Sequence, residues 1–93
     1  MWTNGDSKMQ LFSIYDSKSE THTAPTANPT KAQAIRSFSD AVNSGQDSVL
    51  TQHPADFTLF HIGSFDVHSG KVELLDSKLA VVNGLDVLES SDS

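Results

Sequence analysis

The residues best suited to chemistry in this chain are its four histidines, His22, His53, His61 and His68. No two of them have the i, i+4 spacing that places two metal ligands on one helix face. His61 and His68 could face each other across a hairpin beside Asp66, but zinc sites need three or four converging ligands. We therefore interpret the histidines as turn and strand residues and expect no metal site.

Catalytic machinery is also not indicated. Serine, histidine and aspartate are frequent, but no glycine-flanked serine joins a strand to a helix as in a nucleophile elbow. The five scattered glycines match no phosphate-binding loop. Asp16, Asp56 and Asp66 stand at strand edges, where aspartate usually stabilises turns. The sequence predicts a non-enzymatic protein with no catalytic residues and no cofactor.

Aromatic residues on strands are the remaining candidates, because single-stranded nucleic acid binds by stacking its bases on exposed rings. The aromatic residues on candidate strands are Phe12, Tyr15, Phe57, Phe60 and Phe65. In so small a domain most of these rings are needed for the core. Tyr15 differs because it stands near a strand end, close to Lys18, and we expect its ring to be half exposed.

The charge balance argues against strong non-specific DNA binding. Twelve acidic residues outnumber six basic residues, for a formal net charge of −6. Nucleic-acid binding draws much of its affinity from cations that displace phosphate counterions. A few cations gathered on one face would still create a local basic field.

The chain has 93 residues and no cysteine, so it fits one domain without disulfides or thiolate metal sites. No apolar run approaches the roughly 18 residues of a membrane-spanning helix, so we expect no membrane contact. The N-terminus lacks the basic-then-apolar order of a secretion signal.

The first half of the chain predicts a strand, a loop and a helix. Alternation over residues 9–15 indicates a strand with Phe12 and Ile14 on one face and Leu11 and Tyr15 on the other. Residues 16–29, rich in Ser, Thr and Ala with two prolines, indicate an extended loop. The helix begins with a capping box at residues 30–33, or one turn earlier at residues 28–29. Its apolar spacing ends at residues 43–45, where Gly45 favours a left-handed conformation.

The second half predicts strands after a polar turn over residues 45–56. Residues 57–65 indicate a strand with Phe60 and Ile62 on one face and Leu59 and Phe65 on the other. Residues 66–70 indicate a hairpin turn leading to a third strand at 71–75. A last apolar stretch at 79–88 indicates a short strand followed by a helical turn.

These elements predict one small α+β domain over residues 9–88, between a flexible N-terminal extension (1–8) and a disordered tail (89–93). Its antiparallel sheet has at least three strands in β-α-β-β order, and one amphipathic helix packs on one face through Ile35, Phe38 and Val42. Because the strands are apolar on both faces, we expect a second copy or a partner to cover the other face, and predict a homodimer.

Three segments, in this order and spacing, carry a family resemblance: LFSIYDSK at 11–18, AIRSFSDAVN at 34–43 and PADFTLFHIGSFD at 54–66. Together they resemble the small nonstructural protein of gokushoviruses, the single-stranded DNA phages of the microvirus group. The likeness covers residues 9–75. Two features depart from the family pattern: the residues before Lys8, and the lack of aromatic residues between Ser19 and Pro29.

The resemblance implies a nonstructural protein that acts in the cytoplasm of the infected bacterium and is absent from the mature virion. It implies a part in viral single-stranded DNA replication or packaging, through single-stranded DNA or through a phage or host replication protein. It brings no catalytic residues. The matching positions that could contact DNA are Tyr15, Lys18 and Arg36. The alternative is a protein-interaction module that binds a host or phage factor without nucleic acid.

Overall fold

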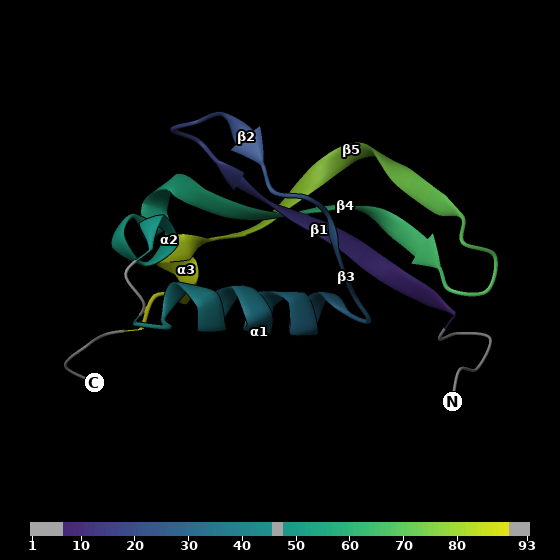
Figure 1. The fold of residues 1–93 in the computed structure, drawn as a ribbon, viewed down its shortest axis with the longest axis horizontal. Coiled ribbons are helices and arrows are strands. Elements are labelled where there is room, and N and C mark those ends of the chain that lie inside the picture. The colour runs from purple at the N-terminus through teal and green to yellow at the C-terminus, as the bar shows by residue number, and fades with distance from the viewer. Residues whose placement is uncertain (1–6, 46–47, 90–93) are drawn as a thin grey trace.

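The computed structural model describes residues 7–45 and 48–89. An antiparallel sheet is covered on one face by helix α1 (Lys31–Val42), which lies along the sheet in Figure 1. The strands of the sheet are β1 (Lys8–Asp16), β2 (Thr21–His22), β3 (Thr26–Asn28), β4 (Phe57–Asp66) and β5 (Val72–Asn83). The predicted α+β class, with a helix on one face of an antiparallel sheet, is confirmed.

The strand order places β1 and β4 at the centre of the sheet. β4 pairs with β1 on one side and with β5 on the other. The other edge of β1 is shared by β2, which pairs near Tyr15, and β3, which pairs near Leu11. Within the described residues no strand pairs with the outer edge of β5.

The segment 16–29 is not the extended loop that its composition predicts, because it contains β2 and β3. Both are edge strands that return along β1, and Thr23 fixes the return through two bonds. Its side chain accepts the backbone N–H of Ile14 at 2.9 Å, and its own N–H donates to the Ile14 carbonyl at 2.9 Å. Strands this short and exposed need no apolar alternation, so the sequence pattern could not reveal them.

The core lies between α1 and the sheet. Its buried members are Phe12, Ala34, Phe38, Val42 and Leu59. Of the two predicted helix starts, the one at Thr30 is observed, since the Thr30 side chain caps the helix by accepting the N–H of Gln33 at 3.1 Å. Gly45 has φ +76°, as predicted for a residue just past the helix end. Ile35 packs against the core but is only partly buried.

A β-bulge at Ile62 reverses the orientation of the end of β4. Leu11 pairs with Gly63 while Phe12 pairs with His61, so β4 has one extra residue at this point. Phe65 therefore shares a face with Met9 and not with Leu59, and its predicted orientation was wrong. A strict two-residue alternation cannot foresee a bulge, which moves every later side chain to the other face.

The C-terminal half extends beyond the predicted elements. β5 continues past residue 75 to Asn83 and is followed by α3 (Gly84–Val87), which accounts for the strand and helical turn predicted at 79–88. The predicted polar turn at 45–56 includes two short helical pieces, α2 (Val49–Gln52) and η2 (Pro54–Asp56). Among the described residues, no helix has the length and apolar character needed to cross a membrane.

The predicted ends of the domain fall mostly outside the described residues. Residues 1–6 of the N-terminal extension and 90–93 of the tail are not described. β1 already begins at Lys8, the last residue assigned to the extension. Glu89, the first residue assigned to the tail, donates its N–H to the Asn43 side-chain oxygen at 2.9 Å.

Candidate nucleic-acid interface

The face of the sheet opposite α1 is called the open face, since within the described residues no helix lies over it in Figure 1. Phe12 and Ile14 pack toward the helix core, so their neighbours Leu11, Ser13 and Tyr15 point to the open face. The strand registers extend this assignment across the sheet. The open-face positions also include Met9, His22, Ala27, Thr58, Phe60, Phe65, Val72, Leu74 and Ala80.

Three rings form a cluster at one end of the open face, and we call them the aromatic cluster: Tyr15, His22 and Phe60. The centroids of Tyr15 and His22 are 4.7 Å apart, and Phe60 meets both rings edge-on, at 6.1 Å from Tyr15 and 5.6 Å from His22. Tyr15 and Phe60 are half-buried and His22 is exposed. The cluster therefore presents ring surface to solvent instead of filling the core.

A hydrogen bond orients one ring of this cluster, and a lysine brings a positive charge to another. The Ser13 hydroxyl is hydrogen-bonded to His22 Nδ1 at 2.9 Å, and Ser13 itself is buried beneath the rings. The Lys78 ammonium group lies 5.7 Å from the centroid of Phe60, within the range of a cation–π contact. The cluster thus combines stacked rings, a positioned imidazole and a cation on one face.

The other end of the open face is mostly aliphatic, with the single aromatic ring of Phe65. We call this set the aliphatic half: Met9, Leu11, Phe65, Val72 and Leu74. Val72 is 52% exposed and Leu74 is 72% exposed, although both are large apolar residues. Apolar side chains gathered and exposed in this way indicate a contact surface.

Formal charge is concentrated away from these strand positions. The open-face residues paired in β1, β4 and β5 include no lysine, arginine or carboxylate among the described residues. Lys8 lies on the opposite face and donates to Glu73 at 3.1 Å, a hydrogen bond that holds the pKa of Glu73 below its ordinary value. Asp66 accepts the N–H groups of His68 and Ser69, which lower its pKa and tie its charge to the hairpin turn.

The structure brings together two of the three predicted DNA contacts. Tyr15 lies in the aromatic cluster, and Lys18 is exposed in the turn that joins β1 to β2 beside it. Arg36 is exposed on α1, about half a helical turn from the buried Ala34 and Phe38, so it points away from the sheet. A single flat surface cannot include both Tyr15 and Arg36.

Sequence reasoning missed the other members of the cluster. His22 was assigned to a loop and Phe60 to the core, and Lys78 stands far along the chain from both. Only the pairing of Tyr15 with His22 and the β4–β5 register bring them together. Alternation alone did place Phe60 and Leu59 on opposite faces, which was the one available signal.

Two further histidines, His61 and His68, lie outside the aromatic cluster. His61 lies on the helix side of the sheet, where its ring stacks on Phe12 at 5.0 Å and Nε2 is 2.9 Å from the Gln10 side-chain oxygen. His68 lies in the hairpin turn. Over residues 7–45 and 48–89, no group of three or more potential protein ligands converges.

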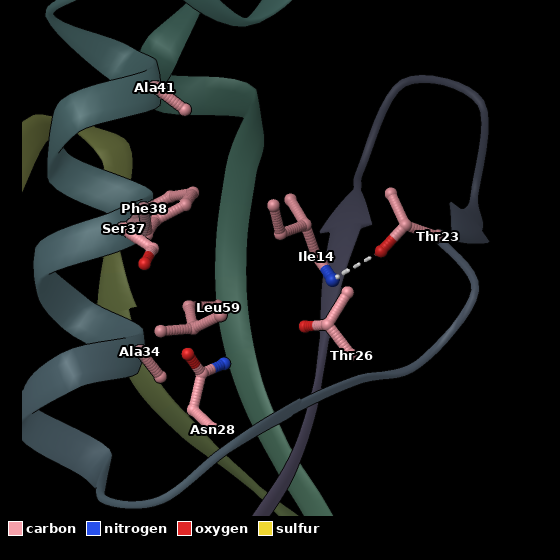
Figure 2. A pocket seen from close by; sticks show the side chains of 9 residues that line it. All are labelled: Ile14, Thr23, Thr26, Asn28, Ala34, Ser37, Phe38, Ala41 and Leu59. Carbon is pink, nitrogen blue, oxygen red and sulfur yellow. Dashed lines mark hydrogen bonds between the residues drawn. The ribbon is translucent and has the colours of Figure 1, made fainter.

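A pocket lies between α1 and the β3 edge of the sheet (Figure 2). Figure 2 shows Thr26 and Asn28 on one wall and Ser37 and Phe38 of α1 on the other. None of the residues that line it is ionisable at neutral pH. The pocket offers hydroxyl and amide groups but no acid, base or nucleophile activated by one.

Comparisons with known proteins give one similarity. A family model with the description Phage ORF5 protein matches residues 9–87. These residues include the aromatic cluster and all five strands, apart from Lys8 at the start of β1. No curated protein and no solved structure matches the chain at a significant level.

Proposed function

The chain belongs to the Phage ORF5 protein family, and from that premise we propose that it is a non-enzymatic phage accessory protein that binds single-stranded DNA through its open face. The observation that carries the proposal is the aromatic cluster, three partly exposed rings with a lysine on one face of a sheet. Exposed rings beside cations are the common means by which sheets bind unpaired bases.

The expected affinity is modest. A base stacked on an aromatic side chain contributes about 1–3 kcal/mol, and each phosphate contact adds a term that falls as salt rises. The cations that we expect to contribute are Lys78, which lies over the Phe60 ring, and Lys18, in the turn after β1, and they act against a net charge of −6. We therefore expect micromolar binding at low salt that weakens at physiological ionic strength.

The biological setting that we propose follows the gokushovirus resemblance of residues 9–75. In that setting the protein acts in the cytoplasm of the infected bacterium, in replication or packaging of the single-stranded genome, and is absent from the virion. Family membership supports a phage protein, and the narrower setting is our proposal. Sequencing of nucleic acid recovered with the protein from infected cells would return viral single strands.

The direct test is fluorescence anisotropy of a labelled oligothymidine at low and at physiological salt. Tyr15→Ala should weaken binding about five- to fifty-fold through lost stacking. Lys18→Glu should weaken it and flatten its dependence on salt, since one phosphate contact is lost. Arg36→Glu makes the same charge change on α1, away from the open face, and serves as the matched control. Absence of binding by the parent protein at low salt would contradict the proposal.

A second candidate function is favoured by the aliphatic half of the open face. Exposed Val72 and Leu74 beside Leu11 and Phe65 suit an apolar protein surface better than a charged DNA backbone. In this alternative the protein binds a phage or host replication factor without nucleic acid. The parent would then show no oligothymidine binding, and Leu74→Glu would abolish capture of that factor while leaving the fold, followed by circular dichroism, unchanged.

A further inference from the structure

The outer edge of β5 is the longest unpaired edge among the described residues. An unpaired strand edge presents N–H and C=O groups that another strand can bind. Residues 75–78 lie opposite the single residue Ile62 of β4, and this part of β5 arches in Figure 1. The strand also exposes apolar side chains among its polar ones, with Leu75 37% and Leu79 54% accessible.

The side chains of the arched stretch can be assigned to faces from its two ends. Leu74 pairs with Gly63 on the open face, and Leu79 pairs with His61 on the helix side. A separation of five residues between opposite faces fits an uninterrupted strand. Asp76 and Lys78 therefore lie on the open face, while Leu75, Ser77 and Leu79 lie on the helix side.

We propose that two copies of this chain join through antiparallel pairing of β5 with β5, with Ser77 on the two-fold axis. A symmetric antiparallel pair always sets one residue opposite its own copy, and residues at equal distances on either side then face each other. With Ser77 on the axis, Asp76 faces the partner's Lys78. Leu75 faces the partner's Leu79, and Leu74 faces the partner's Ala80. Each of these contacts occurs twice.

The Ser77 register sets Glu73 against the partner's Val81, but within residues 75–79 it pairs the side chains better than the neighbouring registers do. Asp76 or Lys78 on the axis sets two like charges opposite each other. Leu75 on the axis sets Leu74 against the partner's Asp76. Leu74 or Leu79 on the axis sets Asp76 against a valine, Val72 or Val82 respectively, of the partner. Only the Ser77 register pairs every charge in 75–79 with its opposite and every leucine with an apolar residue.

The second copy is favoured over another partner because the edge is complementary to itself. Residues 76–78 are an acid, a serine and a lysine. When two copies of this segment pair antiparallel about the serine, each acid lies opposite a lysine. The pairing would join the two sheets and place both open faces on one side. This dimer differs from the one expected from the sequence, in which a second copy covers a face of the sheet, because here the contact is an edge of the sheet. The proposal does not depend on the proposed DNA role.

The first test is light scattering with size-exclusion chromatography at high micromolar concentration. The parent should elute at about 20 kDa, twice the chain mass of 10.0 kDa. Asp76→Lys and Lys78→Asp should each raise the dimer dissociation constant about ten-fold, because each sets like charges against each other twice. The double variant Asp76→Lys with Lys78→Asp should restore the dimer. A parent of about 10 kDa, or single variants that dimerise like the parent, would overturn the proposal.

The second test places a thiol on the axis. The chain has no cysteine, so Ser77→Cys carries one thiol. Residues directly opposite in an antiparallel pair have Cα atoms about 4.5–5.5 Å apart, within disulfide range. Mild oxidation should convert Ser77→Cys to a covalent dimer much faster than Ser17→Cys, a matched variant in the exposed β1–β2 turn. Equal rates for the two variants would contradict the Ser77 register.

Discussion

The two faces of the sheet carry similar aromatic and aliphatic residues but differ in how much of these side chains is exposed to solvent. On the helix side, Phe12, Phe38 and Leu59 are each less than 5% exposed. On the open face, Tyr15 and Phe60 keep part of their ring surface in solvent, and Leu74 is 72% exposed. Burial of the first set stabilises the fold, whereas the second set forms surface that a partner can cover. We therefore expect substitutions on the helix side to change stability and substitutions on the open face to change binding.

The largest effect should come from removing a ring on the helix side. Phe38 is 2% exposed in the centre of the core, so Phe38→Ala should lower the free energy of unfolding by about 3–5 kcal/mol. In a 93-residue domain that loss is large enough to abolish a stable fold. Chemical denaturation followed by circular dichroism measures it. A Phe38→Ala variant as stable as the parent would contradict the assignment of the core to this face.

A glycine on the open face should be the exception to that division. A Cβ at Gly63 would collide with the backbone carbonyl oxygen of Glu73, where β5 passes β4. Gly63→Ala should therefore destabilise the protein by about 1–3 kcal/mol, the usual cost of overpacking. Gly70→Ala is not a suitable comparison because Gly70 has φ +75°, so Ser64→Ala in the same strand serves as the control. Equal thermal melts for Gly63→Ala and Ser64→Ala would show that the strands can separate without cost.

Removing a ring from the aromatic cluster should cost little stability. Tyr15 is half-buried and its contacts are with Phe60 and His22 at the surface. Tyr15→Ala should lower the free energy of unfolding by about 1 kcal/mol, well below the Phe38→Ala loss. The same denaturation measurement applies. A loss equal to that of Phe38→Ala would show that the open face belongs to the core and would remove the contrast between the faces.

The smallest effect should come from the charge of Asp66. Hydrogen bonds from the N–H groups of His68 and Ser69 lower its pKa below the ordinary value of 3.8. The charged form is therefore favoured in the folded state. Its contribution is present above about pH 4 and is lost as pH falls through the lowered pKa. The difference in melting temperature between the parent and Asp66→Asn should be constant near neutral pH and shrink below about pH 4. A difference that grows on acidification would contradict this sign.

Sequence patterns predicted the structural features that depend on interactions between residues close together in the chain. The capping interaction of Thr30, the alternation of Phe12 with Leu11 and the left-handed Gly45 each follow from a few neighbouring residues. The features that define the open face depend on distant pairing. β2 forms only because β1 offers it an edge, and the bulge at Ile62 depends on how β1 and β5 register against β4. For this reason the sequence could single out Tyr15 as a candidate contact residue, while it could not single out His22, Phe60 and Lys78.

We expect single-stranded DNA to contact the open face and not the helix. Titration of oligothymidine into ¹⁵N-labelled protein at low salt, followed by two-dimensional NMR, tests it residue by residue. We predict that backbone amide signals of Tyr15, His22 and Phe60 shift with DNA concentration, while those of α1 around Arg36 stay in place. Shifts confined to α1, or no shifts at all, would contradict DNA binding at the open face.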